Sequence, residues 1–319
     1  MTYKVALIGL GNIGYKFGKD ASSNSSLSHY SAYDSNPSTQ VIAGYTPDEM
    51  ELNSFENATG IKGYRDLNKL FEIKPDIVSI CSPTENHIEN LELCLNNNIP
   101  MIWLEKPIAS KIDSINSLRQ NLKSMKQPPK ILVNFFRRYH SGYIKLRRLI
   151  KNKTFGELTY ININYSKGLL NNGLHMLDMI PFLFNVSSYE VIWKERISER
   201  ENPSFILEAD SGLKIYVHGT NTDYHNIDIT VTTQSAKLSI IHGGMTVRVE
   251  KSREHELFPG FYRLSDSDDE SLGSGGFMNA FDLALTDLID CYEKNSSPNS
   301  NLETAYFSHQ LLETVISDG

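Results

Sequence analysis

A short apolar run followed by three glycines constrains this chain more than any other feature. Residues 5–8 have the composition of a buried parallel strand, and Gly9, Gly11 and Gly14 follow it in the pattern GxGxxG. In that context the first glycine permits a tight turn, the second lets a pyrophosphate approach the backbone, and the third lets helix and strand pack closely. The pattern predicts a dinucleotide-binding turn whose cofactor contacts are Gly9, Gly11, Asn12, Ile13 and Gly14.

Strand and helix patterns alternate through the rest of the first half. Four further apolar runs have the length of buried strands, at 41–45, 77–81, 101–104 and 131–134. Helical patterns lie between them, for example at 86–97 and 110–125. Strands that alternate with helices form βαβ units and a parallel sheet. We therefore predict an α/β Rossmann domain over residues 1–126, because the prolines at 128 and 129 interrupt any helix there.

The second half shows the period-two alternation of antiparallel strands with one buried face. The alternation is clear at 161–165, 227–232 and 247–249, with turn residues at 210–212 and 242–244. Helical patterns return at 277–292 and 301–316, after a Ser-, Asp- and Gly-rich segment at 265–276 that we expect to be a mobile loop. Residues 127–319 are therefore predicted to form an α+β domain with a mostly antiparallel sheet.

Composition excludes several classes of protein. The 319 residues suffice for two domains, and 40% hydrophobic with 22% charged residues is typical of a globular chain. A net charge of −7 argues against a nucleic-acid partner. The first apolar run is too short for a signal peptide, and no run approaches the roughly 20 residues of a membrane helix. Three cysteines without a CxxC pair favour a reducing compartment, so we expect a cytoplasmic protein with no membrane partner.

The segment after the second predicted strand departs from the dinucleotide-binding fingerprint. An acid is expected there to bind the ribose hydroxyls, but Thr46 holds that position and Asp48 is the nearest substitute. The acidic residues Asp48, Glu49 and Glu51 would repel a 2′-phosphate. We therefore predict NAD as the cofactor, with Thr46 and Asp48 near the ribose, and leave NADP open.

A second departure follows the glycines. The polar segment Gly18–Ser28 lacks helical periodicity and is predicted to be an insertion that breaks the first crossover helix, which resumes near 29–33. Such an insertion either overhangs the cofactor or substrate cleft or is a solvated surface loop.

Further motifs extend over nearly the whole chain. Ser82, Pro83 and Thr84 follow the third strand, and His87 opens the next helix. Glu105, Lys106 and Pro107 follow the fourth strand, and an Asn-Gly-x-His motif ends at His175. With the glycine turn, with residues 136–139 and 155–157, and with the late helix at 277–288, this ordered set resembles the Gfo/Idh/MocA oxidoreductase family, named for glucose–fructose oxidoreductase and inositol dehydrogenase. The resemblance implies that residues 82–84, His87 and 105–107 bind the cofactor.

The resemblance also implies an open second-domain sheet that serves substrate binding and oligomerisation, and hence a homodimer or homotetramer. It implies hydride transfer between the nicotinamide and a secondary alcohol or ketone of a sugar. His175 would then be the base, because its unperturbed pKa is ~6.5, and Lys106 would stabilise the developing alkoxide. We expect Arg138, Asn172 and Asp178 to contact the substrate, which the resemblance suggests is a sugar or a nucleotide sugar from surface-glycan biosynthesis.

One position of the expected catalytic set is changed. The family usually has Asp four residues before the motif histidine, and this chain has Asn171 there. Asn171 can donate and accept hydrogen bonds but cannot supply a carboxylate charge. Either it is a neutral member of the catalytic set, or Asn171 or Asn172 caps the following helix. This change and the ribose site leave open a nicotinamide-binding sensor without catalysis. The family resemblance leaves open a second alternative, an NAD-assisted glycosidase. His175 and Asp178 have no third ligand nearby in sequence, so we predict no metal.

Overall fold

The computed structural model describes residues 2–17, 26–195, 201–266, 273–274 and 276–317. It divides into two compact units, Met1–Phe136 with Met278–Tyr306, and Arg137–Phe277 with Phe307–Gly319. The first unit extends beyond the predicted domain boundary at residue 126, because the strand Lys130–Val133 pairs with the preceding strand of the same sheet. The helix Ala280–Glu293 was predicted in the second domain, but it packs on the first sheet and belongs to the first unit.

Among the described residues, the first unit contains one parallel sheet of six strands. Its order is β3-β2-β1-β4-β5-β6. β1 and β4 lie at the centre, and the order in which successive strands are added to the sheet reverses between them, while all the strands stay parallel. The strands are β1 (Tyr3–Ile8), β2 (Thr39–Tyr45), β3 (Gly63–Tyr64), β4 (Ile77–Ile80), β5 (Met101–Leu104) and β6 (Lys130–Val133). β1, β4 and β5 are almost wholly buried, as their continuous apolar sequences predict. The two-residue edge strand β3 carries too little pattern to be predicted.

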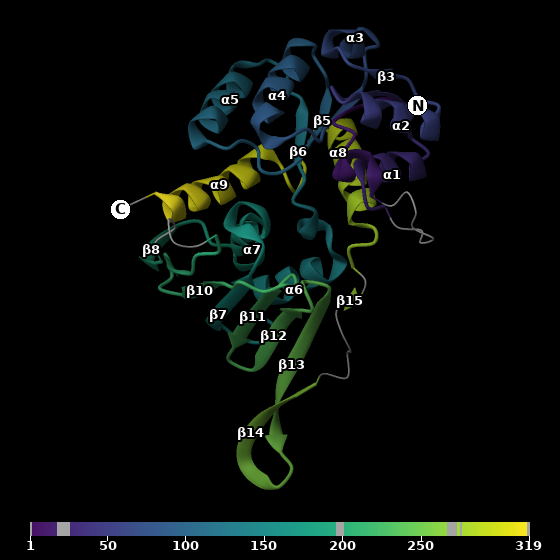
Figure 1. The fold of residues 1–319 in the computed structure, drawn as a ribbon. Coiled ribbons are helices and arrows are strands. Elements are labelled where there is room, and N and C mark those ends of the chain that lie inside the picture. The colour runs from purple at the N-terminus through teal and green to yellow at the C-terminus, as the bar shows by residue number, and fades with distance from the viewer. Residues whose placement is uncertain (1, 18–25, 196–200, 267–272, 275, 318–319) are drawn as a thin grey trace. The chain divides into compact units, whose positions relative to one another are not determined.

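Helices cover both faces of this sheet (Figure 1). α1 packs against α8 on one face, and α4 packs against α5 on the other. Their bounds are α1 (His29–Ser35), α2 (Glu49–Thr59), α3 (Leu67–Glu72), α4 (His87–Asn96), α5 (Ile112–Ser124) and α8 (Ala280–Glu293), with short helices η1 (Asn12–Lys16) and η2 (Thr84–Asn86). The break of the first crossover helix and its resumption at His29 are as predicted, while residues 18–25 of the insertion lie outside the described part.

The second unit is built on a mostly antiparallel sheet. In the part of the chain that is described, its order is β14-β13-β12-β11-β7-β10-β9-β8, and a short β15 pairs with β13. β7 and β10 are the exception, because they run parallel. The strands are β7 (Leu158–Tyr165), β8 (Tyr189–Lys194), β9 (Phe205–Ala209), β10 (Lys214–Gly219), β11 (Ile227–Thr233), β12 (Ala236–Ile241), β13 (Thr246–His255), β14 (Phe258–Asp266) and β15 (Gly273–Ser274).

Alternation along β11 shows how the sheet divides its faces. Ile227, Ile229 and Val231 are buried, while Asp228 and Thr230 between them are partly exposed. Each residue therefore faces the side that the period-two pattern predicts. The helices of this unit are η3 (Phe136–Tyr139), α6 (Ser141–Lys151), η4 (Gly168–Gly173), α7 (Leu174–Phe184) and α9 (Leu302–Ile316), of which η3 and α9 cross the division between the units.

The predicted fold class is confirmed: a parallel Rossmann sheet is followed by a mostly antiparallel sheet. The loop predicted at 265–276 lies largely outside the described residues.

Candidate functional site

The three glycines after β1 have different reasons to lack a side chain. A Cβ on Gly9, whose φ is +98°, would lie 2.5 Å from the carbonyl oxygen of Cys81 at the end of β4. A Cβ on Gly14 would lie 2.2 Å from the carbonyl oxygen of Gly9. A Cβ on Gly11 would meet nothing within 4 Å. Gly9 and Gly14 therefore let the turn close on the sheet, while the open space over Gly11 fits the approach of a pyrophosphate.

The turn leads directly into η1, where Asn12 and Ile13 form the first turn of a five-residue helix. Tyr15 and Lys16 both donate their amides to the carbonyl of Gly11. The first amides of a helix have no acceptor within it, so those of Asn12 and Ile13 fit a phosphate oxygen.

At the end of β2 the side chains form a connected polar group. The Thr46 hydroxyl donates to Glu51 Oε2 at 3.2 Å, and Lys16 Nζ lies 2.7 Å from Glu51 Oε1. Asp48 caps α2 by accepting from the amide of Glu51 at 2.9 Å. Glu51, which we did not predict as a site residue, is thus the acid that contacts Thr46. Its signal in the sequence is its place three residues after an Asp that caps a helix.

His87 joins the loops that follow β4 and β5. Its side chain is nearly fully buried, with ring nitrogens 2.8 Å from the carbonyl oxygen of Ser82 and 2.7 Å from that of Pro107. The Asn90 amide donates to the Ser82 hydroxyl at 2.9 Å. His87 therefore holds the Ser82–Thr84 and Glu105–Pro107 segments together.

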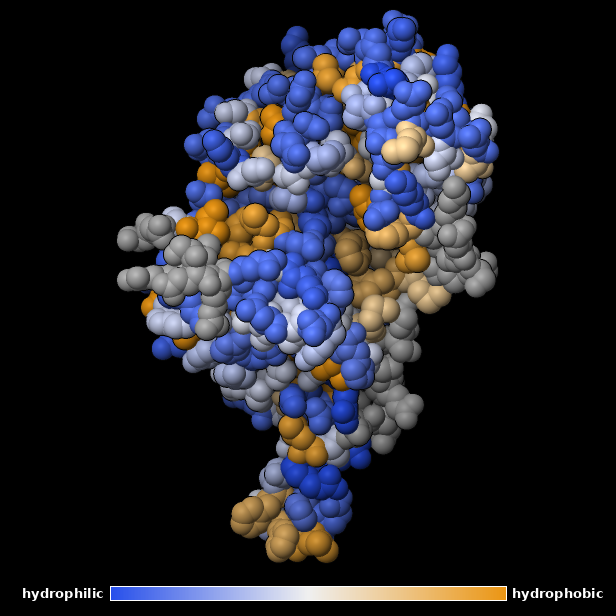
Figure 2. All heavy atoms as spheres, viewed as in Figure 1, coloured by the Kyte–Doolittle hydropathy of each residue, from blue (hydrophilic) through white to orange (hydrophobic). Residues whose placement is uncertain are grey.

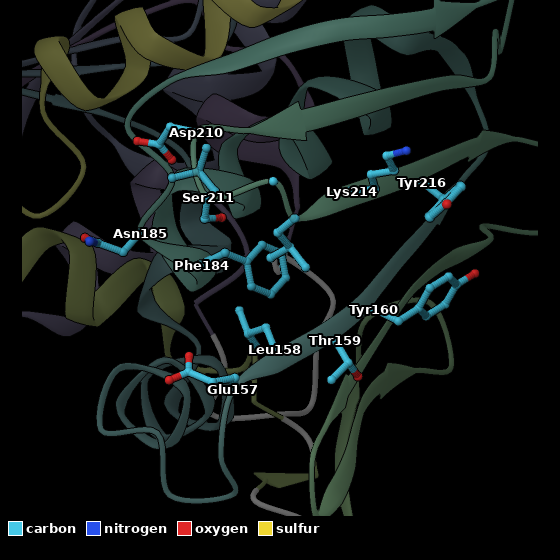
Figure 3. A pocket seen from close by; sticks show the side chains of 13 residues that line it. Glu157, Leu158, Thr159, Tyr160, Phe184, Asn185, Asp210, Ser211, Lys214 and Tyr216 are labelled. Carbon is cyan, nitrogen blue, oxygen red and sulfur yellow. The ribbon is translucent and has the colours of Figure 1, made fainter.

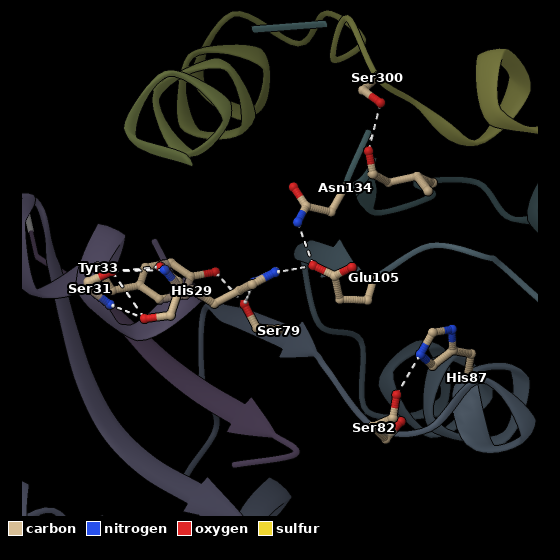
Figure 4. Close-up of polar contacts among 11 residues, drawn as sticks. His29, Ser31, Tyr33, Ser79, Ser82, His87, Glu105, Asn134 and Ser300 are labelled. Carbon is tan, nitrogen blue, oxygen red and sulfur yellow. Dashed lines mark hydrogen bonds and ion pairs between the residues drawn. The ribbon is translucent and has the colours of Figure 1, made fainter. Parts of the chain in front are cut away.

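Glu105 is buried at the end of β5, beside Lys106. Its Oε1 accepts a hydrogen bond from Asn134 and lies 3.0 Å from Nε2 of His29 (Figure 4). Burial alone would raise the pKa of Glu105, but the His29 and Asn134 hydrogen bonds and the Lys106 charge outweigh burial and lower it. Glu105 is therefore an anchored carboxylate next to the proposed catalytic lysine. His29 and Asn134 were not predicted as site residues.

In the first unit, the structure brings the predicted residues to one edge of the sheet. The glycine turn and the segments at Thr46, Ser82 and Glu105 follow β1, β2, β4 and β5. The carboxyl ends of parallel strands share an edge, and ligands of this class of sheet bind there, next to the point where strand order reverses.

In the second unit, Arg138 and Asp178 bind one another. Arg138 Nε lies 2.8 Å from Asp178 Oδ2, its terminal nitrogen lies 2.7 Å from Oδ1, and the Ser308 hydroxyl also donates to Oδ1. Asp178 is 0% exposed and Arg138 is 6% exposed. A bidentate pair of this kind fixes the relative orientation of its two side chains. In the structure, both residues therefore connect η3, α7 and α9.

Asn171 and Asn172 lie in η4, immediately before α7. Asn172 is buried and donates from its side-chain amide to Nδ1 of His225 at 3.1 Å. His175 is also buried, in the first turn of α7, and no side chain caps that helix. The predicted capping role of the asparagines is therefore not observed, and the motif places Asn171, Asn172 and His175 within one turn of each other.

The best-defined cavities among the described residues of the second unit are not lined by Asn171, Asn172 or His175. One of about 660 Å³ lies beside β7, β10 and the end of α7 (Figure 3). Its lining includes Tyr160, Asp210, Lys214 and Tyr216 but none of the predicted site residues.

In the described ranges, no cluster of three or more His, Cys, Asp or Glu side chains is arranged to hold a metal. No helix in the same ranges has both the length and the apolarity to cross a bilayer.

Comparison with known proteins matches the first unit to a known family. Residues 3–134 match the family GFO_IDH_MocA, described as an oxidoreductase family with an NAD-binding Rossmann fold. Inositol 2-dehydrogenase of Rhizobium meliloti is 24% identical over 76% of this chain and 68% of its own length, and that of Salmonella typhimurium is 22% identical over 91% and 86%. The structure of the WlbA dehydrogenase from Chromobacterium violaceum, in complex with NADH and UDP-GlcNAcA, has a TM-score of 0.78 at 16% identity and covers 98% of this chain and 92% of that one.

The glycine turn, the sheet order and these matches agree. They confirm the predicted resemblance: residues 3–134 match the Gfo/Idh/MocA family of NAD-binding oxidoreductases, and relatives named inositol 2-dehydrogenase match beyond them at 22–24% identity.

Proposed function

We propose that this chain is an NAD-dependent dehydrogenase that transfers a hydride between the nicotinamide and a secondary alcohol of a polyol or sugar. The observation that carries the proposal is Lys106, which follows an anchored carboxylate at the edge of the sheet where the glycine turn lies. Relatives named inositol 2-dehydrogenase match up to 91% of the chain, so the match extends over both units.

The proposed chemistry needs three things from the protein. When bound, NAD⁺ supplies the hydride acceptor. Lys106 would hold the alcohol oxygen and stabilise the negative charge that develops there, and His175 would take the hydroxyl proton. Asn171 would orient the alcohol through its amide, since an amide can hydrogen-bond a hydroxyl but brings no charge.

The remaining predicted residues divide into two groups. We propose that the glycine turn, Thr46, the Ser82–Thr84 loop and the Glu105–Pro107 loop bind NAD, with Glu51 added near the ribose. The Thr46–Glu51–Lys16 group supports NAD over NADP, because the only cation in it is already neutralised by Glu51. Asn172 remains a proposed substrate contact, whereas the mutual pairing of Arg138 and Asp178 favours a structural part for them.

The substrate class can be tested with purified protein. We propose a panel of NAD⁺ with inositols, hexoses and UDP-linked sugars, monitored by NADH absorbance, with one positive substrate then deuterated at its carbinol carbon. The proposal expects turnover of a free polyol or sugar and deuterium transfer to the NADH. Turnover of the UDP-sugars alone would move the substrate to the nucleotide-sugar class, whose reason for inclusion is the UDP-GlcNAcA bound to the WlbA dehydrogenase.

Two results would contradict the proposal. NAD binding without turnover of any panel member would favour a sensor that has lost catalysis. Hydrolysis of a glycoside without net NADH formation would identify an NAD-assisted glycosidase.

A further inference from the structure

A chain of four buried polar side chains runs through the core of the first unit to Glu105 (Figure 4). The Tyr33 hydroxyl lies 2.7 Å from the Ser79 hydroxyl, which lies 2.9 Å from Nδ1 of His29. Nε2 of His29 lies 3.0 Å from Glu105 Oε1. Tyr33, Ser79 and His29 are each 0% exposed. Buried polar groups are costly unless they are fully hydrogen-bonded, so each member depends on its neighbours.

The charge of Glu105 sets the direction of every hydrogen bond in this chain. The ionised carboxylate only accepts, so Nε2–H of His29 donates to it. When Nε2 carries the only ring proton, Nδ1 accepts from the Ser79 hydroxyl, and Ser79 accepts from Tyr33. Tyr33 stays protonated, because burial raises the pKa of its phenol far above the ordinary value. The four groups thus form one consistently oriented series with Glu105 as its final acceptor.

The same residue types in this order occur in hydrolytic triads, but a nucleophilic role does not fit here. Ser79 is completely buried within β4, so no substrate reaches its hydroxyl. Packing also fixes His29, whose ring lies 4.0 Å from that of Trp103 and 5.7 Å from that of Phe281 between centroids. The series therefore acts through its last member, Glu105, which adjoins Lys106 at the end of β5.

We propose that His29 is a positioning residue for Lys106: by donating to Glu105 it keeps the carboxylate ionised and aimed, and so fixes the charge and the backbone next to the catalytic lysine. This inference rests on the proposed function, because it assigns Lys106 to the reacting oxygen. His29 lies directly after the polar insertion and Glu105 lies just after β5, so their hydrogen bond links two segments far apart in the sequence.

The surroundings of the pair limit which groups can affect its titration. His29 faces Ser79 on β4, Tyr33 on its own helix, Trp103 on β5 and Phe281 on α8, of which only Tyr33 ionises. Glu105 faces Asn134, Lys106 and Cys81, and burial together with the Glu105 charge raises the pKa of the Cys81 thiol, so that thiol stays neutral. Among the described residues, His29 and Lys106 are the titratable side chains that lower the pKa of Glu105.

Two substitutions separate positioning from simple packing. His29→Gln places an amide nitrogen near the former Nε2 and keeps a donor for Glu105, whereas His29→Asn places its polar atoms near the former Nδ1 and loses that donor. Both remove the aromatic ring. With the Glu105 hydrogen bond gone, burial raises the pKa of the carboxyl. We expect His29→Asn to lower kcat/KM at neutral pH by about tenfold, with NAD affinity within about twofold of the wild type. The acid limb of the pH profile that comes from protonation of Glu105, which lies below the limb of the proposed base His175, should move up by about one unit. His29→Gln should restore the acid limb.

Equal loss in both variants, with an unshifted acid limb, would show that His29 only fills space and would overturn the inference. Thermal melting of each variant identifies loss of the fold. If His29→Asn does not fold, Glu105→Gln replaces it, since the amide oxygen still accepts from His29 but the charge is gone. We then expect lower kcat and no acid limb from this carboxyl, and a wild-type pH profile would overturn the inference.

Failure of the proposed function gives a different result. If wild-type protein shows no turnover, or Lys106→Met retains full turnover, the assignment of Lys106 fails whatever the His29 variants do. Tyr33→Phe serves as the matched control, because it removes only the far end of the series and leaves the His29–Glu105 hydrogen bond in place. An acid limb that moved as far in Tyr33→Phe as in His29→Asn would contradict the specific role of His29.

Discussion

Gly9 and Gly11 are two residues apart in the same turn, yet the structure predicts opposite consequences for adding a methyl group. Gly11 has φ −72°, which any residue adopts, and open space around its Cβ position. Gly11→Ala should therefore keep the wild-type melting temperature but weaken NAD binding by about tenfold or more, because the methyl group occupies the space that a pyrophosphate needs. Isothermal titration and thermal melting of the same samples measure both quantities.

Gly9→Ala is the matched comparison. Its positive φ and its contact with the Cys81 carbonyl should cost about 1–3 kcal/mol of folding free energy. A stable Gly9→Ala protein, or unchanged NAD affinity in Gly11→Ala, would contradict this account of the turn.

At the residue scale, sequence motifs identified the positions that follow strands but not the partners behind them. Local sequence patterns predict the positions of Gly9, Lys106 and His87. Each lies in a turn or at the end of a strand, and such features depend only on neighbouring residues. His29 and Asn134 contact Glu105 from 76 and 29 residues away, so no local pattern carries that information. Arg138 and Asp178 illustrate the reverse case: each has a charge suited to a sugar or phosphate, but they pair with each other across 40 residues.

At the element scale, α6 begins with a histidine as its cap. Nδ1 of His140 accepts from the amide of Gly142 at 3.0 Å, while its ring packs on Tyr143 and Phe277. Burial lowers the pKa of His140 from 6.5 to about 4, and the Arg137 charge adds to that effect. Because the unfolded chain binds this proton more readily than the folded one, the folded state loses stability as pH falls from about 6.5 towards 4.

The replacement His140→Asn tests this element. Asn keeps an acceptor for the cap but does not titrate, so the decline in urea-unfolding free energy between pH 6.5 and 4 should become shallower by roughly 1–3 kcal/mol. Unfolding curves at several pH values for both proteins provide the comparison. Identical acid slopes would show that His140 contributes nothing to acid sensitivity.

Strand and helix types were predicted from periodicity because each element has an apolar face of the right period. The assignment of α8 to a domain was not predictable in that way. The sequence of an amphipathic helix shows that it has a buried face, but not which sheet covers that face. In α8, Phe281 packs against Trp103 of the first sheet.

At the scale of the whole molecule, we predict that the chain self-associates. The hairpin of β13 and β14 lies at one end of the second sheet, and its tip is apolar (Figure 2). The exposed fractions of its large apolar residues are 77% for Leu257, 58% for Phe258, 70% for Phe261 and 69% for Tyr262. Apolar clusters of this kind mark interaction surfaces, and the family resemblance implies a dimer or tetramer. Light scattering should give a dimer or larger species for the wild type and a smaller species for the double variant Phe258→Ser, Phe261→Ser. Unchanged mass with an intact fold would exclude this hairpin from the interface.

For the whole enzyme, we propose that Lys106 acts on the reacting oxygen of an alcohol while the turn at Gly9 holds NAD. The most direct test compares wild type and Lys106→Met for NADH formation with the positive polyol or sugar, alongside NAD⁺ affinity by titration. We predict that kcat falls at least about a hundredfold, because the alkoxide loses its cation, while the Kd for NAD⁺ changes by no more than about twofold. Wild-type turnover in Lys106→Met would contradict the account.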